Sequence, residues 1–460
     1  MNVLLLVPDG VSARNFLLTG LPHGLTTAGK VDVLVNRELL EQYEGDVEGV
    51  ERMKAFGPYP ERPLEAAVRR TLEYAHLRWC NTAGARLNLD APIPGSARSR
   101  ILRSAAREAS RVLAGPRSLP RLVTVHDHLA DRRPEVGTYV DLLREWDTDI
   151  VLCAHQRPLV VQPVVMAAKR KGIPTATFIF SWDNLTTKGR IAAPFDHYFV
   201  WSDQMAEELN RFYPDVEASR VHVVGSPQFE PYAEPSLRWD REQFLRGLGL
   251  DADRPVICYS GGDTLTCPED PEHLRIVCEL IQNGQIQGDP QLILRPAPVD
   301  TSDRYNAVLE RYPVVLSRPV WRDGGEGWSS VVPSRSDMEL LVNLTRHADL
   351  NINMASTMTL DFALHDTPVV NLGFDVDASK NLAPRYYDFD HYRPVVQMGA
   401  ARVVRDPAEL AGAVNAYLAD PSLDREGRAR FVDHELRVRP GGSIPAVAQA
   451  LAGISSVTRA

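Results

Sequence analysis

Short apolar runs bounded by turn-forming residues recur along the first half of the chain. They lie at residues 2–7, 31–35, 149–154, 174–180, 197–202 and 221–225. Between several of them, apolar residues recur at helical spacing, as in 139–146 and 164–171. Strand and helix signals that alternate in this way predict a mostly parallel sheet covered by helices on both faces.

A second series of the same kind follows in the other half of the chain. Its predicted strands are 255–260, 291–295, 313–317, 348–353 and 368–373, and its clearest helices are 271–283 and 336–347. The stretch between the two series, 226–240, has three prolines and no periodicity, which is typical of a linker. We therefore predict an α/β protein with two doubly wound domains, 1–230 and 231–425, followed by helices over 426–460.

Length and composition agree with two folded domains. The chain has 460 residues, 44% hydrophobic and 24% charged, which is too long for one ordinary core. The first apolar run is short and lacks a basic leader, so it favours a buried strand and a cytoplasmic location. The five cysteines lack metal-ligand spacing, so neither a zinc site nor a disulfide framework is predicted. A net charge of -9 argues against general nucleic-acid binding.

A pair of hydroxyl residues stands at the end of one predicted strand. If 350–353 is a strand and 357–365 a helix, then Ala355, Ser356 and Thr357 form the turn at the carboxyl end of that strand. Ligands of open α/β sheets bind beyond this end, where helix N-termini favour anions. The turn is therefore a candidate phosphate site.

Asp361 follows Thr357 by four residues, so both side chains project from one helix face. A phosphate on the turn would leave its attached ribose or sugar near this carboxylate. The alternative is that Ser356 only caps the helix and Asp361 is solvated.

Two other strand ends of the same domain also favour anions. Ser260, Gly261 and Gly262 end the first strand, and paired glycines let backbone amides approach a phosphate. Arg295 ends the next strand, although it could instead be a structural ion-pair partner. Together with the turn at 355–357, these residues favour a ligand that carries a diphosphate.

This combination resembles glycosyltransferases of the GT-B fold, in particular the branch with CDP-glycerol glycerophosphotransferases and UDP-N-acetylglucosamine 2-epimerases. The resemblance is concentrated in VVGSPQFE (223–230), LILRPAP (292–298), NINMASTMTLDFALHDTPVVNLGF (351–374) and RPGGSIPAVAQAL (439–451). It implies two Rossmann-like domains facing a central cleft, with a nucleotide-activated donor on the C-terminal domain and an acceptor met by the N-terminal one. It also implies that the terminal helices cross back to the first domain.

Three differences from that branch reduce the number of reactions that this chain is expected to catalyse. Glycerophosphotransferases carry a histidine where this chain has Ala297. Many retaining GT-B enzymes have two glutamates eight residues apart, where this chain has Asn353 and Asp361. The epimerases show Ser-Gly-Gly where this chain has the turn at 355–357. The differences favour an inverting sugar transfer.

An inverting transfer needs a base for the acceptor hydroxyl and positive groups for the leaving diphosphate. Asp9, His155 and Asp183 each follow a predicted strand of the N-terminal domain, so we expect them to line one edge of its sheet. We rank Asp9 first, because a tight turn places it, then His155 and Asp183. Each has another interpretation, as a turn residue, a helix cap or a structural histidine.

Residues 98–121 hold seven arginines and one acid, Glu108, with apolar residues at helical spacing. This pattern fits either an amphipathic helix on an anionic membrane or lipid-diphosphate acceptor, or an arginine-rich outer face over an ordinary core helix.

The leading hypothesis is a metal-independent inverting glycosyltransferase that moves a sugar from a nucleotide-sugar to a glycan or lipid-linked acceptor, in bacterial surface-polysaccharide assembly. The nucleotide-sugar is a substrate, and no cofactor is expected. The alternatives are a CDP-polyol phosphotransferase, a nucleotide-sugar epimerase, and an inert nucleotide-sugar-binding partner.

Overall fold

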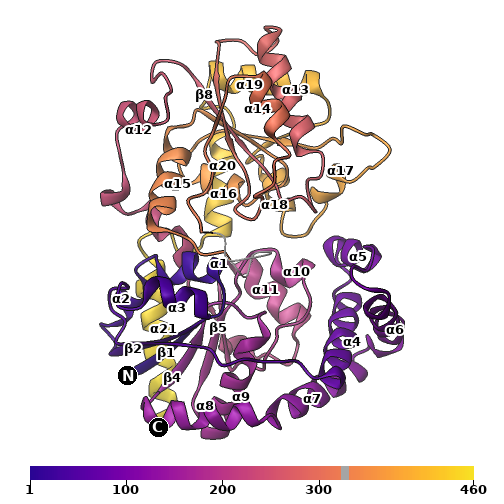
Figure 1. Cartoon of the computed structure of the whole chain (residues 1–460), viewed down its shortest axis with the longest axis vertical. Coiled ribbons are helices and arrows are strands. Elements are labelled where there is room, and N and C mark those ends of the chain that lie inside the picture. The colour runs from indigo at the N-terminus through magenta and orange to yellow at the C-terminus, as the bar shows by residue number, and fades with distance from the viewer. Residues whose placement is uncertain (323–330, 460) are drawn as a thin grey trace. The chain divides into compact units, whose positions relative to one another are not determined.

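The computed structural model describes residues 1–322 and 331–459 and divides into two compact units (Figure 1). Unit 1 comprises Met1–Glu230 and Leu436–Ala460, and unit 2 comprises Pro231–Glu435. The last helix, α21 (Ser443–Arg459), packs against α2 (Leu21–Leu25) and belongs to unit 1. Helix α20 (Arg425–Glu435), which the sequence grouped with the terminal helices, belongs to unit 2.

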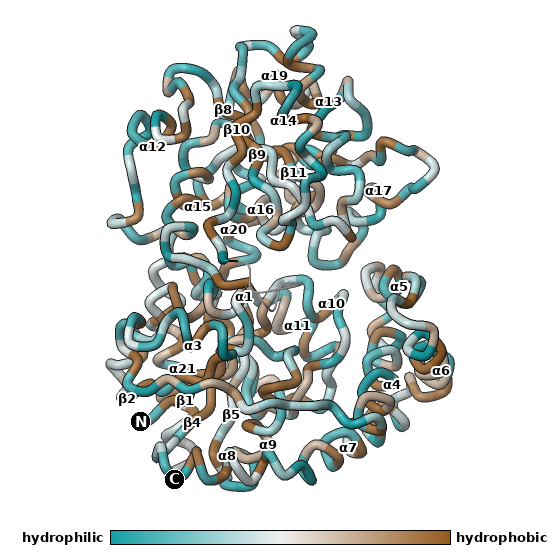
Figure 2. Tube along the Cα trace, viewed as in Figure 1, coloured by the Kyte–Doolittle hydropathy of each residue, from teal (hydrophilic) through white to brown (hydrophobic). Residues whose placement is uncertain are grey.

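Unit 1 is built on a seven-stranded parallel sheet with the order β3-β2-β1-β4-β5-β6-β7. Its strands are β1 (Asn2–Val7), β2 (Lys30–Val35), β3 (Arg52–Ala55), β4 (Ile150–Cys153), β5 (Thr175–Phe178), β6 (His197–Val200) and β7 (Val221–Val223). The central strands β1 and β4 are apolar and buried apart from Asn2 at the start of β1, as expected for strands covered on both faces, and Figure 2 shows these strands in brown. The sequence missed only β3, an edge strand whose residues are partly exposed.

Unit 2 is built on a six-stranded parallel sheet with the order β10-β9-β8-β11-β12-β13. Its strands are β8 (Val256–Ser260), β9 (Gln291–Arg295), β10 (Val314–Leu316), β11 (Leu350–Asn353), β12 (Val369–Leu372) and β13 (Arg402–Val404). The sequence missed the short edge strand β13. The prediction of two doubly wound, Rossmann-like domains is confirmed.

Both sheets reverse their strand order at an equivalent place. The reversal lies between β1 and β4 in unit 1 and between β8 and β11 in unit 2. In open α/β sheets, the crevice at such a switch point is where ligands bind. The residues that follow these four strands are therefore the first to consider for function.

Helices cover the two sheets. Those of unit 1, besides α2 and α21, are α1 (Gly10–Ser12), α3 (Arg37–Tyr43), α4 (Pro63–Cys80), α5 (Ala83–Asp90), α6 (Ala97–Leu113), α7 (Ser118–Asp131), α8 (Pro134–Glu145), α9 (Gln162–Lys171), α10 (Asn184–Thr187) and α11 (Asp203–Phe212). Those of unit 2, besides α20, are α12 (Arg241–Gly247), α13 (Asp270–Gln282), α14 (Asn306–Arg311), α15 (Arg335–His347), α16 (Met358–Ala363), α17 (Ala383–Tyr386), α18 (Arg393–Met398) and α19 (Pro407–Ala419). Among the described residues, no helix is both long and apolar enough to cross a bilayer.

The connection from β3 to β4 is expanded into a helical insertion that includes α4, α5, α6 and α7 (Figure 1). Helix α4 packs against the other three. Its small apolar cluster joins Leu72 and Ala75 to Leu119 of α7. The segment 98–121, predicted as one amphipathic stretch, is interrupted between α6 and α7 at Gly115 and Pro116.

Candidate functional site

Two sequence-predicted residues meet at the switch point of unit 1. Asp9 follows β1 and caps the first turn of α1, and His155 follows β4, the neighbouring strand. The Nδ1 atom of His155 lies 2.6 Å from Oδ2 of Asp9. The parallel pairing of the two strands, with Leu6 opposite Cys153, brings these side chains together.

The Asp9 carboxylate is buried and has a partner for each oxygen. Oδ1 accepts from the backbone N–H of Ser12 at 2.8 Å, and Oδ2 faces His155. Burial raises the pKa of Asp9, but the His155 charge and the hydrogen bonds from His155 and Ser12 outweigh it and hold the pKa below its usual value. An ionised carboxylate can only accept, so Nδ1 of His155 carries the proton and Nε2 is the basic atom.

The His155 ring is fixed on its other side by an aromatic contact. It stacks on Phe180, with ring centroids 4.1 Å apart and planes inclined by 25°. The side chain is 15% exposed, so the imidazole is largely buried but not sealed. No residue within the described chain hydrogen-bonds Nε2. This atom is therefore placed to exchange a proton with a bound molecule.

Asp183, the third candidate, is held by its own helix. Its carboxylate accepts from Asn184 Nδ2 at 2.9 Å and from Thr187 Oγ1 at 3.0 Å, and Lys188 Nζ lies 3.4 Å away. Gln156, next to His155, donates to Asn184 Oδ1. The Asp183 loop thus supports the His155 segment, while its carboxylate is engaged locally.

The glycine turn after β8 in unit 2 is closed by protein acceptors. Gly261 N–H donates to the Arg295 carbonyl at 2.8 Å, and Gly262 N–H donates to Asp270 Oδ2 at 2.9 Å. A Cβ at Gly261 would lie 2.5 Å from the Tyr305 hydroxyl. Close packing therefore explains why a glycine stands at position 261. The N–H groups of both glycines already donate to protein acceptors.

Arg295 forms a buried ion pair. Its Nη2 lies 3.0 Å from Oδ1 and 3.1 Å from Oδ2 of Asp337 on α15. Asp337 also accepts from the Trp321 indole N–H at 2.6 Å. Arg295 Nη1 is buried and has no hydrogen-bond partner within the described chain. The structural ion pair that the sequence left open is present, and one guanidinium nitrogen, Nη1, makes no hydrogen bond within the described chain.

A buried polar network supports the switch point of unit 2. The Asn353 side chain at the end of β11 is hydrogen-bonded to Asn351, Thr359 and Asn371. The Tyr392 hydroxyl is hydrogen-bonded to both Thr359 and Asn371. All five of these side chains are fully buried. The network fixes the strand ends rigidly, since each member satisfies its neighbours.

Ser260 joins this network from β8. Its Oγ accepts from Asn351 Nδ2 at 2.8 Å, and Asn351 also donates to the Cys258 carbonyl. The Ser260 side chain is therefore hydrogen-bonded within the buried network.

The turn at 355–357 is anchored by the same network. The Ser356 N–H donates to Asn353 Oδ1 at 2.9 Å, and Ala355 has a φ of 44°, in the left-handed region that disfavours residues with a Cβ. The Thr357 hydroxyl, in contrast, makes no hydrogen bond to a described residue, and both hydroxyl residues are only partly buried. The Ser356 hydroxyl accepts from the Met358 N–H at 3.3 Å and keeps its own proton to donate, so both hydroxyls can donate to a ligand.

Asp361 has a partner that the sequence did not indicate. The Tyr232 hydroxyl donates to Asp361 Oδ1 at 2.5 Å, and the carboxylate is largely buried. Tyr232 lies at the start of unit 2, 129 residues away, so only the fold could show the contact.

Several functional neighbours were missed from the sequence. Asp337, Tyr232 and Phe180 carry no motif of their own. The asparagines of β11 gave the clearest signal, because uncharged amides in an otherwise apolar strand need buried partners.

The two parallel sheets, each with the strand order of a doubly wound domain, and the last helix returned to the first unit define the GT-B fold. The resemblance stated from the sequence is confirmed at this level. No protein-family model matches the sequence, and the comparison with curated proteins gives no match.

Solved structures match over nearly the whole chain. UDP-GlcNAc 2-epimerase from Neisseria meningitidis bound to UDP-GlcNAc is 10% identical with a TM-score of 0.56, covering 98% of this chain and 100% of that one. A glycosyltransferase from Rickettsia africae is 9% identical with a TM-score of 0.52, covering 99% and 98%. MnaA of S. aureus in complex with UDP is 9% identical with a TM-score of 0.52, covering 96% and 94%. At these identities the likeness establishes the fold.

Proposed function

We propose that this chain is an inverting glycosyltransferase that moves a sugar from a nucleotide-activated donor to a glycan or lipid-linked acceptor, in surface-polysaccharide assembly. The observation that carries the proposal is the His155 imidazole, oriented by the buried Asp9 carboxylate at a switch point. A base so held can take the proton of an acceptor hydroxyl as that oxygen attacks the anomeric carbon. His155 thus replaces Asp9 as the proposed base, and Asp9 becomes a positioning residue.

Asp9 is the weaker base because both of its oxygens have partners and its pKa is lowered. Its negative charge stabilises the imidazolium that forms when His155 takes the proton. Asp183 is placed third, since its carboxylate is engaged within α10.

The donor is proposed to bind at the switch point of unit 2. The unused Nη1 of Arg295 and the hydroxyls of Ser356 and Thr357 are the donors proposed for the diphosphate. Asp361 is proposed to accept from a hydroxyl of the ribose or sugar. Four further residues shape the site without offering side-chain donors to it: Ser260, Gly261, Gly262 and Ala355.

We propose that the nucleotide of the donor is a uridine nucleotide. Two of the similar structures hold UDP-GlcNAc and UDP, and this is the support for uridine. The leaving diphosphate would be stabilised by the guanidinium and hydroxyls, so we expect turnover to survive EDTA.

The residues at 353 and 361 favour inversion of the anomeric configuration over retention, because many retaining GT-B enzymes have glutamates at the corresponding positions. Asn353 is a neutral amide inside the buried network, and Asp361 is bonded to Tyr232. A single displacement needs one base and no such pair, and His155 supplies it.

An epimerase is the second candidate, because the fold matches structures of UDP-GlcNAc 2-epimerases at TM-scores up to 0.56. The two functions differ in what they need. A transferase releases nucleoside diphosphate only as sugar reaches an acceptor or water, whereas an epimerase yields the 2-epimer of the donor without any acceptor.

The experiment is a thermal-shift screen with UDP, CDP, GDP, TDP and CMP, followed by product analysis with the matching nucleotide-sugar. We expect UDP to raise the melting temperature, since a ligand that binds only the folded state stabilises it. Acceptor-dependent release of UDP would support transfer. Release of CMP, formation of the 2-epimer, or binding without turnover would each replace the proposal with the corresponding alternative.

A further inference from the structure

Helix α6 exposes large aliphatic side chains. Ile101 is 69% exposed, Leu102 53% and Val112 81%. With 3.6 residues per turn, these three and the exposed Ala105 and Ala109 fall within an arc of about 100° on one face of the helix. We name these five residues the α6 stripe.

The opposite face of α6 is small and polar, and it is the face packed in the helical insertion. Ala106 and Ser110 are buried, and Arg78 Nε of α4 donates to Ser110 Oγ at 2.8 Å. Arg107 Nη1 donates to the Leu89 carbonyl at 3.1 Å. Ala106 is buried and Leu113 packs against the cluster of α4 and α7, but the large residues Ile101, Leu102 and Val112 face outward. For these three residues the second interpretation of the sequence, an arginine-rich outer face over an ordinary core helix, is therefore wrong.

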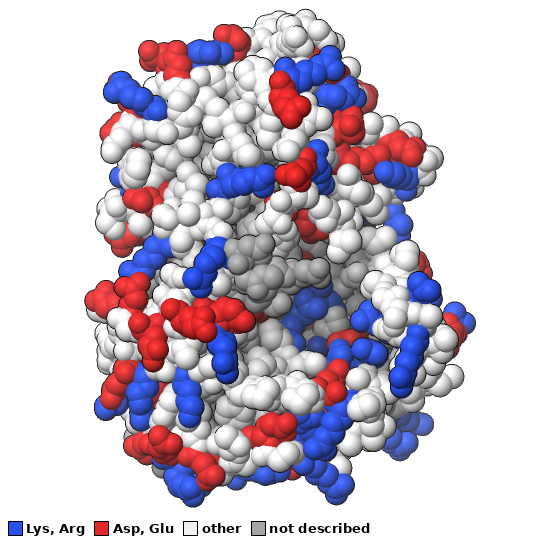
Figure 3. All heavy atoms as spheres, viewed as in Figure 1, with Lys and Arg blue, Asp and Glu red and all other residues white. Residues whose placement is uncertain are grey.

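Basic residues border the α6 stripe. Arg98 lies within its arc, Arg100 and Arg111 lie about 80–100° round the helix from its edge, and all three are exposed. The exposed acid Glu108 lies next to the stripe and forms an ion pair with Arg111 at 3.1 Å. Figure 3 shows Lys and Arg side chains in blue along the edge of unit 1 that carries this insertion. Segment 98–121 carries seven arginines and one acid in a chain whose net charge is -9. Arg103 and Arg107 lie on the packed side of α6 and are only partly exposed, so Arg98, Arg100 and Arg111 are the exposed arginines of this helix.

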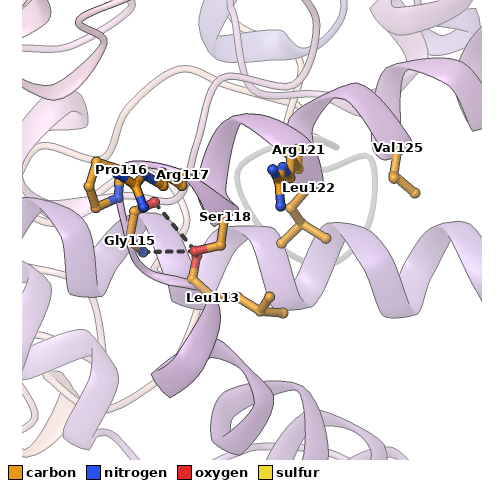
Figure 4. Close-up of a pocket in the computed structure, with 8 residues that line it drawn as sticks. All are labelled: Leu113, Gly115, Pro116, Arg117, Ser118, Arg121, Leu122 and Val125. Atoms are coloured by element: carbon orange, nitrogen blue, oxygen red, sulfur yellow. Dashed lines mark hydrogen bonds between the residues drawn. The ribbon is translucent and has the colours of Figure 1, made fainter.

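An open groove of about 640 Å³ continues this surface onto α7 (Figure 4). Leu113, Leu122 and Val125 supply its apolar lining, and Arg117 and Arg121 supply its charge. The Ser118 hydroxyl donates to the Leu113 carbonyl at 3.0 Å and so fixes the corner between the two helices.

We propose that the α6 stripe and this groove dock on the surface of an anionic lipid bilayer, with α6 lying in the plane of the interface. Aliphatic side chains on one helix face with arginines around them match acyl chains beneath anionic headgroups. This inference is independent of the reaction proposed above.

The test is co-sedimentation of the full chain with vesicles of phosphatidylcholine alone or of phosphatidylcholine mixed with phosphatidylglycerol. We expect binding to the mixed vesicles only, and weaker binding as salt is raised, because exposed charges are screened. Equal binding to both vesicles, or binding to neither, would overturn the proposal.

Two variants separate the apolar and the charged contributions. Ile101→Ser with Val112→Ser should weaken binding about tenfold, since the inserted aliphatic area is lost. Arg98→Gln with Arg100→Gln should also weaken it about tenfold and reduce its salt dependence. Val396→Ser, on an exposed aliphatic residue of unit 2, is the matched control and should bind like wild type. Unchanged binding by both α6 variants would refute the proposal.

A labelled variant reports insertion directly. All five native cysteines are buried, so an environment-sensitive dye attached to Ile101→Cys labels one exposed site. Its emission should shift to the blue with mixed vesicles, whereas the same dye on Val396→Cys should not respond. If the shift at position 101 instead followed protein concentration without vesicles, the stripe would be an interface between copies of the chain.

Discussion

His155 Nδ1 lies 2.6 Å from Asp9 Oδ2, although 146 residues separate the two in the chain. The contact exists because β1 and β4 are neighbours in the sheet and both side chains follow the carboxyl ends of those strands. A buried carboxylate beside an imidazole that is still partly exposed is an arrangement suited to proton transfer.

Asp9→Asn should reduce kcat by about 100-fold or more, because an amide neither fixes the imidazole tautomer nor stabilises the imidazolium. The affinity for UDP should stay close to that of wild type. The measurement is turnover of the nucleotide-sugar together with calorimetry for UDP. Asp183→Asn is the control, and a larger loss there than in Asp9→Asn would transfer the role to Asp183.

The pair can also be tested as a unit. His155→Gln should lose at least as much turnover as Asp9→Asn, and the double variant should lose little more than His155→Gln alone, because Asp9 acts through His155. Additive losses would show that the two residues act separately.

Strands buried on both faces could be predicted well from the sequence. The predicted ranges 2–7 and 291–295 are those of β1 and β9, because a short apolar run with a polar residue at its edge marks where a buried strand begins or ends. The edge strands β3 and β13 were missed because both strands are short and their residues are of both polar and apolar types and are partly exposed.

The candidate site was predictable by position but not by contact. Because both residues follow predicted parallel strands, the sequence placed Asp9 and His155 on one edge of the sheet. Their hydrogen bond depends on which strands are neighbours, and the sequence did not predict that order. The same logic expected free amides at Gly261 and Gly262, but acceptors from β9 and α13 occupy them. Which partner reaches a turn is decided by packing across the sheet, and local sequence does not contain that information.

Thr357→Val should weaken UDP binding by about 0.5–1.5 kcal/mol, the usual contribution of one hydrogen bond. The substitution keeps the shape and removes a hydroxyl that is unbonded within the described chain, so the melting temperature of the free protein should hardly change. Calorimetry with UDP and a thermal melt measure the two quantities. Equal affinities would exclude Thr357 from the donor site.

Arg295→Ala should lower the free energy of unfolding by about 3–5 kcal/mol, because it leaves the Asp337 carboxylate buried without its cation. Adding Asp337→Asn should restore part of that loss, since the remaining side chain is neutral. Urea denaturation of both variants provides the comparison. A double variant no more stable than the single one would show that the charge of Asp337 is compensated elsewhere.

Ala355→Gly should leave the unfolding free energy unchanged or raise it by up to about 1 kcal/mol. Glycine adopts the observed φ of 44° without strain, which offsets the greater entropy of its unfolded chain. Ala355→Val should be clearly less stable than either, because a β-branched residue is disfavoured in this region. If valine were tolerated as well as glycine, the turn would be free to change its conformation.

His365 should make the protein less stable in mild acid. Burial and, after it, the charges of Arg346 and Arg238 lower the pKa of His365 to about 4 from 6.5. The unfolded chain therefore binds a proton that the folded chain refuses between these values, and the unfolding free energy falls as pH drops from about 6.5 towards 4. The loss by pH 5 should be about 1–2 kcal/mol.

His365→Phe isolates this effect. The Nε2 atom of His365 is buried and has no hydrogen-bond partner within the described chain, and the ring packs edge-on against Tyr232 with centroids 5.5 Å apart. Phenylalanine keeps that ring contact and cannot be protonated, so at pH 7 the variant should unfold at a urea concentration close to that of wild type. At pH 5 it should retain more stability than wild type, while the slope that remains belongs to other buried histidines such as His76, whose pKa burial also lowers. If urea midpoints of the two proteins fell in parallel from pH 7 to pH 5, the protonation of His365 would not be coupled to folding.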